Sequence, residues 1–169
     1  MPYTRTRLLL AAATFMSGIL AGIVVDRVLV AGPAWHGLGP EVWAQFSQRA
    51  DLGTGLIAYP VEAIGTTLLL IAAGVSSHFD RITRWRVPSP LIAAVALSLL
   101  TLLITAKAAP SMLSFRAVEP PALQPTFNDF FFWGLYLRGA VDVLAFVAPV
   151  WASYANWLMA ERHSSGVAR

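Results

Sequence analysis

The sequence predicts an all-α integral membrane protein, a four-helix bundle that forms a single domain over residues 1–169. The first observation is composition: 57% of the residues are hydrophobic and 12% are charged, whereas a soluble domain is about one quarter charged. The second is a set of four apolar runs, each long enough to cross the ~30 Å hydrocarbon layer as a helix. Together they argue against a soluble enzyme, a disordered chain or a nucleic-acid binder.

The four expected spans lie at about 8–31, 52–76, 90–109 and 130–159. A helix pairs its own backbone groups, which is what allows it to cross lipid. Arg5 and Arg7 before the first run also suit a signal peptide, but the run is long for one and no convincing cleavage site follows. We therefore expect the first run to be a membrane span. The chain has no cysteine, which excludes disulfides and thiolate chemistry.

Arginine residues favour a cytoplasmic location for both termini. They gather before the first span, between the second and third, and after the fourth: Arg5, Arg7, Arg81, Arg84, Arg86, Arg162 and Arg169. With four spans these segments share one side, and positively charged flanks mark the cytoplasmic side. The net charge of +3 is thus a topology signal. The expected location is the cell membrane, with the N- and C-termini in the cytoplasm.

The two outer loops differ in their expected structure. In residues 32–51, Pro40 suits the first position of a helix, and Trp43 and Phe46 follow at helical spacing. This pattern predicts a short helix in the membrane interface, where tryptophan is favoured. The second outer loop is rich in proline and is expected to be irregular. Its prolines are Pro110, Pro120, Pro121 and Pro125.

Ionisable residues within the spans gather in the outer half and balance in sign. They are Asp26, Arg27, Glu62, Lys107, Arg138 and Asp142. Each costs about 2.5–3.5 kcal/mol on insertion scales, so each needs a reason to be there. Asp26 follows Gly18 and Gly22 at steps of four, which predicts that it faces the bundle. Lys107 and Arg27 are expected to reach towards the interface.

The candidate catalytic residues are Glu62, Asp142, Arg138 and Asp26. Arg138 and Asp142 are i,i+4 partners on one helix face. Glu62 has no basic neighbour on its own helix, so its partner must be Arg138 or Lys107. Carboxyl groups placed in this way suit general acid–base chemistry. The alternative is that Arg138–Asp142 and Asp26–Arg27 are charge pairs that hold the bundle together.

Aromatic side chains cluster in the same outer half. Aromatic rings next to the ionisable residues would accept a flat lipophilic substrate. Anchoring of these side chains at the membrane–water interface explains them equally well. The candidate substrate-binding residues are Trp35, His36, Tyr59, Asn128, Trp133 and Tyr136. His78 and His163 lie on the opposite side, so no two histidines can hold one haem. We expect no cofactor and no metal.

Five short motifs occur in order along the chain. They are Gly18-Ile-Leu-Ala-Gly22, Ala31-Gly-Pro-Ala34, Gln45-Phe-Ser-Gln48, Lys107-Ala-Ala-Pro110 and Trp133 to Arg138. This pattern resembles a family of small four-span membrane proteins of unknown function that includes the anthrone oxygenases. The family usually has asparagine where this chain has Lys107, and a Trp-Asn pair before the arginine of span four. Only Pro110 and Arg138 carry over as family residues.

The resemblance implies oxidation of an aromatic polyketide anthrone by oxygen without a cofactor. Glu62 or Asp142 would then be the base, and Arg138 would stabilise the oxyanion. Two alternatives remain open: a cyclase or isomerase that protonates an epoxide or alkene, and a non-catalytic subunit or carrier component. The apolar inner halves of the spans argue against a carrier. Expected partners are the lipid bilayer and a lipophilic small molecule, with no nucleic acid; a homo-oligomer is left open.

Overall fold

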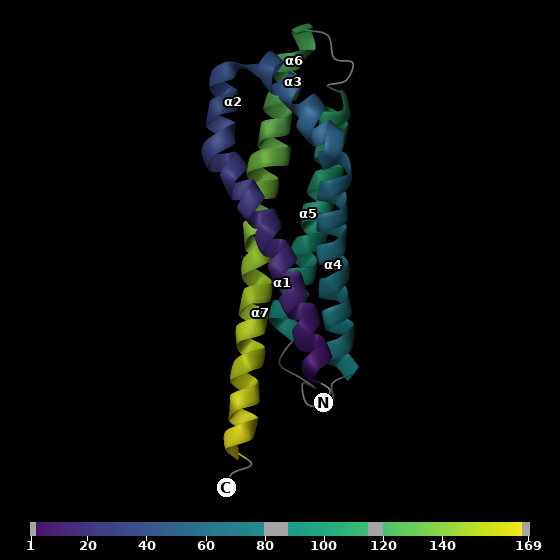
Figure 1. Cartoon of the computed structure of the whole chain (residues 1–169), viewed down its shortest axis with the longest axis vertical. Helices are drawn as coiled ribbons and strands as arrows, with labels where there is room; N and C mark the ends of the chain where they lie inside the picture. Colours follow the sequence, from purple (N-terminus) through teal and green to yellow (C-terminus); the bar gives the residue numbers. More distant parts are fainter. Residues whose placement is uncertain (1–2, 80–87, 115–119, 167–169) are drawn as a thin grey trace.

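The computed structural model describes residues 3–79, 88–114 and 120–166, and within these ranges the chain is almost entirely helical with no strand (Figure 1). In chain order the elements are α1 (Tyr3–Asp26), the π-helical segment η1 (Arg27–Ala31), α2 (Gly32–Leu38), α3 (Pro40–Arg49), the π-helical segment η2 (Ala50–Thr54), α4 (Gly55–Phe79), α5 (Pro88–Ser114), α6 (Pro120–Phe130), the π-helical segment η3 (Phe131–Leu137) and α7 (Arg138–Gly166). Four continuous helical stretches are long and apolar enough to cross a membrane, which agrees with the four expected spans.

The long helices form a four-helix bundle in which each helix has two neighbours. Helix α1 packs against α4 and α7, and α5 packs against the same two helices. The first turn of α1 and the last turn of α7 lie at the same end of the bundle, and α2, α3 and α6 lie at the opposite end (Figure 1). We call the end with α2, α3 and α6 the outer end. The side of the membrane that it faces stays a prediction.

The two loops at the outer end both contain helices. Residues 40–49 form α3 with Pro40 in its first turn, and its place in the membrane interface stays a prediction. The expectation of an irregular second loop is wrong for residues 120–130, which form α6. Proline is tolerated in the first turn of a helix because the missing N–H would have no partner there. Arg81, Arg84, Arg86 and Arg169 lie outside the described residues.

The inner half of the bundle is closed by alanine and leucine side chains. Its buried members are Leu10, Ala13, Leu70, Ala73, Leu91, Ala94, Ala148 and Ala152. Small residues allow membrane helices to approach closely. Helix α7 lies tightly against α1 at Gly139, where a Cβ atom would lie 2.6 Å from Cγ1 of Val24. This contact fixes the start of α7, and therefore Arg138 and Asp142, against α1.

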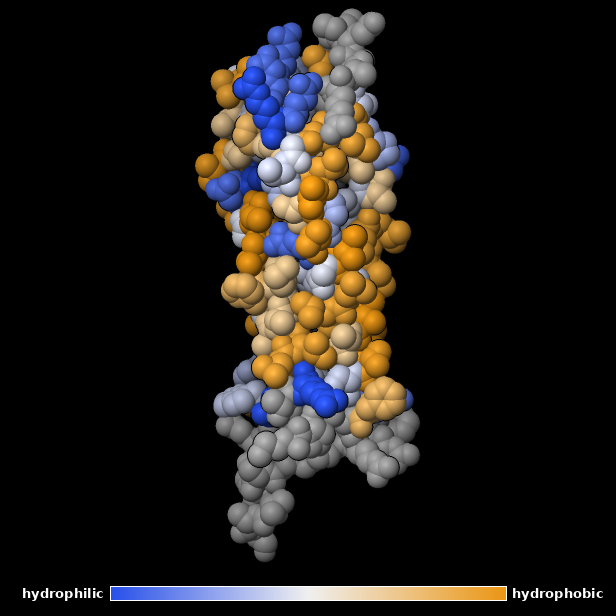
Figure 2. Space-filling model, turned by 45° about the vertical axis from the view of Figure 1, so that its right-hand side comes forward, coloured by the Kyte–Doolittle hydropathy of each residue, from blue (hydrophilic) through white to orange (hydrophobic). Residues whose placement is uncertain are grey.

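The outward surface is apolar along the length of the bundle. Figure 2 shows hydrophobic side chains over most of the middle of the molecule, with hydrophilic ones mainly towards the two ends and a few between them in the upper half of the view. Large apolar residues stand out from this surface, including Phe15, Ile57, Leu103 and Trp151, each more than 60% exposed. Such a surface is stable only against lipid or another apolar partner. The surface, like the lengths of the helices, is thus the one expected of a membrane protein.

Candidate functional site

Asp142 and Arg138 lie at the start of α7 and form a buried but loose ion pair. The Asp142 side chain is 1% exposed and that of Arg138 is 18% exposed, and 3.4 Å separates Nε of Arg138 from Oδ2 of Asp142. Among the described residues, neither Nε of Arg138 nor either carboxylate oxygen of Asp142 has a hydrogen-bond partner. The expected i,i+4 pairing is confirmed, but the pair leaves the carboxylate unsatisfied.

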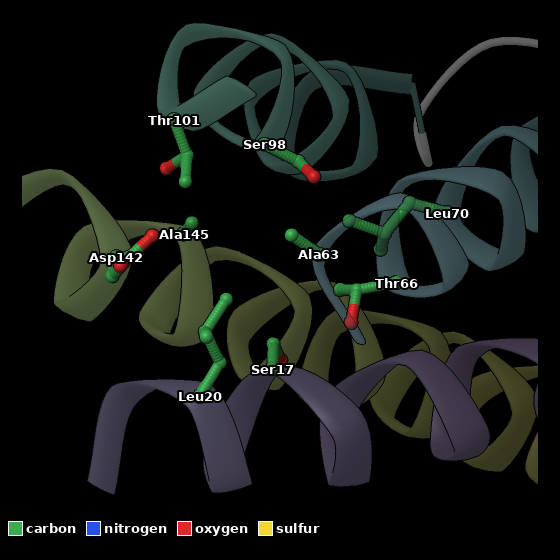
Figure 3. Close-up of a pocket in the computed structure, with 9 residues that line it drawn as sticks. All are labelled: Ser17, Leu20, Ala63, Thr66, Leu70, Ser98, Thr101, Asp142 and Ala145. Atoms are coloured by element: carbon green, nitrogen blue, oxygen red, sulfur yellow. The ribbon is translucent and has the colours of Figure 1, made fainter. Parts of the chain in front are cut away.

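The Asp142 carboxylate borders a small cavity to which all four long helices contribute (Figure 3). The cavity has a volume of about 10 Å³, which is room for one water molecule. Its polar lining consists of Ser17, Thr66, Ser98, Thr101 and Asp142. Its apolar lining consists of Leu20, Ala63, Leu70 and Ala145. The cavity lies where the polar outer half meets the closed inner half.

The hydroxyl groups around this cavity differ in their bonding. Ser98 shares a 2.5 Å hydrogen bond with Thr67, and Ser17 donates to the carbonyl of Thr14 at 3.0 Å. Thr66 and Thr101 are buried and, among the described residues, their hydroxyl oxygens have no hydrogen-bond partner. Thr101 is close enough to Asp142 to act on its carboxylate, whereas the Thr66 hydroxyl borders the cavity without such a neighbour. This cluster was not expected as a unit, because its members come from different helices.

Glu62 lies on α4, between the cavity and the outer end of the bundle. It is half-buried, and the charges that act on it are the attractive Arg138 and the repulsive Asp142. Of the two partners expected for Glu62, Arg138 is therefore the one within electrostatic reach. Lys107 is exposed, and its ammonium group lies 6.0 Å from the ring centre of Trp133.

A second polar cluster lies closer to the outer end and is tightly bonded. Nη2 of Arg27 donates to Oδ1 of Asp51 at 2.5 Å and to the hydroxyl of Tyr59 at 2.6 Å. Ser47 donates to the other carboxylate oxygen of Asp51 at 2.9 Å. The guanidinium also lies 4.9 Å from the ring centre of Tyr59 and 5.9 Å from that of Trp35, which adds cation–π attraction. We call Arg27, Ser47, Asp51 and Tyr59 the outer cluster.

The expected inward orientation of Asp26 is wrong, because Asp26 is exposed. Buried residues of α1 repeat every seven positions, as Leu10, Ser17 and Val24 do. The same step from Ala13 and Leu20 leads to Arg27. A stripe of steps of four drifts by about 40° per step on a helix of 3.6 residues per turn. Arg27 therefore turns inward to Asp51 instead of reaching towards the interface.

Asp51 is the functional candidate that sequence reasoning missed. It is 2% exposed and belongs to the π-helical segment η2, as Arg27 belongs to η1. Such π-helical turns occur frequently at functional sites. The available signal was the i,i+4 spacing of Ser47 and Asp51 in a stretch expected to be helical. It was weak because an aspartate near a loop is usually solvated.

The aromatic residues of the outer half form a packed core. Trp35, Trp43, Phe127, Phe130 and Phe131 are buried together. The ring centres of Trp43 and Phe130 lie 4.7 Å apart, and those of Phe127 and Phe131 lie 4.3 Å apart. These rings fill the space between α2, α3, α6 and η3, so in this conformation they stabilise the outer end.

The other expected substrate-binding residues are dispersed. His36 is exposed and lies edge-on to Phe131, with 4.4 Å between the ring centres. Tyr136 and Asn128 are exposed, and Trp133 is half-buried. The described cavity touches none of these residues, and of the four expected catalytic residues it touches only Asp142. Among the described side chains, no group of three or more histidine, aspartate or glutamate residues could hold a metal ion.

Comparisons with known proteins add no relative. The chain matches no family model, no curated protein and no solved structure. The resemblance to the family that includes the anthrone oxygenases therefore remains a hypothesis from the sequence.

Proposed function

We propose that this protein is an integral membrane enzyme that acts on a small lipophilic substrate through a buried acid–base site. The site consists of Asp142, Arg138 and Glu62. The observation that supports it best is the Asp142 carboxylate, 2% exposed and without a hydrogen bond among the described residues. Leaving a buried charged group unsatisfied costs free energy, and strongly perturbed ionisable groups cluster at functional sites.

The proposed roles follow from the charges of the three groups. Asp142 is the base that removes a proton from carbon, and Arg138 stabilises the negative charge that develops on the substrate oxygen. In anthrone oxidation the carbanion would react with oxygen, giving the quinone and water. In cyclisation or isomerisation, one carboxyl group would protonate an epoxide or alkene and the other would remove a proton from the product.

The substrate is expected to enter from the lipid in the outer half. The cavity at Asp142 has room for one water, so the helices around it would have to separate for a larger molecule to bind. Glu62 is half-buried and would be the first ionisable group that such a molecule meets. The apolar cluster of the inner half leaves no polar route onward, which disfavours a transmembrane carrier.

A second candidate function is a non-catalytic membrane subunit, and the small volume of the cavity favours it. In that case Arg138, Asp142 and Glu62 would only help to hold the bundle together. Burying a charge pair seldom adds net stability, so this role alone gives a poor account of the unsatisfied carboxylate.

Oxygen uptake by the purified protein in the presence of an anthrone tests the first function. We expect turnover by the wild type, and loss of at least tenfold in kcat for Asp142→Asn, because the base is gone. Asp26→Asn is the matched control, since Asp26 is exposed on α1, and its activity should be unchanged. A folded Asp142→Asn variant with full activity would remove Asp142 from the mechanism. Turnover of an epoxide or alkene without oxygen uptake would favour the cyclase.

We also propose that both termini are cytoplasmic and that the protein resides in the cell membrane. Support comes from the first turn of α1 and the last turn of α7 at one end of the bundle, and from Arg5 and Arg7 at that end. A reporter enzyme that works only in the cytoplasm should be active when it is fused after Arg169. Activity of a periplasmic reporter there would refute the orientation.

A further inference from the structure

We propose that the cavity between Ser17, Thr66, Ser98, Thr101 and Asp142 is a binding site for one internal water molecule that hydrogen-bonds the Asp142 carboxylate. The inference extends the proposed acid–base site, since it gives the buried carboxylate a partner for proton exchange. It stands on the geometry of the bundle, so it can be tested without a substrate.

The size and lining of the cavity match a single water. Its volume is about 10 Å³, and a water needs roughly one probe sphere of space together with two to four polar partners. Thr66, Thr101 and Asp142 supply these partners, because their oxygens are buried and lack a hydrogen bond among the described residues. In Figure 3 the hydroxyl of Thr101 and the carboxylate of Asp142 lie on one side of the cavity, and Thr66 lies across from them.

The charges around the cavity favour a neutral ligand over a cation. The Arg138 guanidinium already stands 3.4 Å from Asp142 and balances its charge. A metal ion bound beside it would bring a second positive charge into a space of low dielectric. A water can both donate to the carboxylate and accept from the threonine hydroxyls, which makes it the better match.

The water would link Asp142 to the helix that carries Glu62. Thr66 lies four residues after Glu62 on α4, so the two side chains are neighbours on one helix face. A hydrogen-bonded water between Thr66 and Asp142 would then lie one helix turn from Glu62. It would give Asp142 a partner for proton exchange that needs no polar path through the inner half.

The sign of a stability change distinguishes a bound water from a dry cavity. Thr66→Val and Thr101→Val keep the side-chain shape and remove the hydroxyl group. If the hydroxyls bind water, each substitution should lower the Tm in detergent by several degrees. If the cavity is dry, Thr66→Val removes a buried unsatisfied hydroxyl, which is neutral or stabilising, whereas Thr101→Val also removes a hydroxyl that acts directly on the Asp142 carboxylate. A Tm of Thr66→Val equal to or above that of the wild type would therefore overturn the proposal.

Thr105→Val is the matched control, because Thr105 is on the same helix and its hydroxyl already donates to the carbonyl of Thr101 at 2.8 Å. We expect a smaller loss of Tm for it than for Thr101→Val. If Thr101→Val does not fold, Thr101→Ser replaces it in the test, because serine retains the hydroxyl. Thr101→Ser should fold with a Tm near that of the wild type. Failure of Thr101→Ser to fold would count against the water.

The wild-type Tm should be the same in NaCl, KCl and choline chloride at equal ionic strength. A rise specific to sodium that Asp142→Asn abolishes would show a cation site instead of a water site, and would overturn the proposal. None of these measurements uses a substrate. Their failure would therefore leave the proposed catalytic function to be tested separately by turnover.

Discussion

Replacing the buried Asp51 by asparagine should destabilise the outer cluster, and much more than the same change at an exposed aspartate. Asparagine keeps the shape but removes the negative charge that pairs with Arg27 at 2.5 Å. A hydrogen bond to a charged group contributes about 1.5–3 kcal/mol, and breaking a fully buried pair costs about 3–5 kcal/mol. Because 18% of the Arg27 side chain remains exposed and asparagine can still accept one hydrogen bond, we expect a loss of about 2–3 kcal/mol.

The measurement is the free energy of unfolding in mixed micelles, followed by circular dichroism. Asp26→Asn is the matched control, since the same chemical change is made at an exposed residue next to Arg27, and it should alter stability by less than about 0.5 kcal/mol. In a double-mutant cycle, Arg27→Ala and Asp51→Asn should be strongly non-additive. Equal effects of Asp26→Asn and Asp51→Asn would refute the inward assignment of Arg27.

Two further substitutions test the packing, each by unfolding free energy and each with a control in the same fold. Gly139→Ala should cost about 1–3 kcal/mol, because the new Cβ would lie 2.6 Å from Val24. Its control is Gly22→Ala, whose Cβ meets nothing within 4 Å and which should be neutral or stabilising. A larger loss for Gly22→Ala than for Gly139→Ala would contradict the close contact of α1 and α7. Trp43→Ala should cost about 3–5 kcal/mol because Trp43 is fully buried, while Trp151→Ala, at a residue 61% exposed, should cost far less; equal losses would show that Trp43 is not a core residue.

The four spans could be predicted because their signal is local. Each apolar run is long enough to cross lipid on its own, and the helices of the structure follow those runs. The helix α6 could not be predicted, since prolines usually mark irregular loops. It begins with two prolines, a position where proline's fixed φ suits a helix. Proline therefore interrupts a helix at some positions and suits its first turn at others.

The candidate site could be predicted only where its residues are close in the sequence. Arg138 and Asp142 are four residues apart, so a helix alone brings them together. Arg27 and Asp51 are 24 residues apart, and their contact depends on the path of the chain through α2 and α3. Asp26 was placed inward because the glycine stripe is extended by steps of four, and the seven-residue repeat of buried positions became visible only in the bundle.

Helix α4 connects the outer cluster to the cavity. Tyr59, Glu62 and Thr66 follow one another at steps of three and four residues, which keeps them on one face. Tyr59 bonds Arg27 at the outer end, and Thr66 borders the cavity beside Asp142. Below the cavity the helices pack through an apolar cluster. Polar side chains thus follow one another on α4 from the outer end as far as the cavity. This arrangement supports the proposed proton exchange at a buried carboxyl group better than transport across the bilayer.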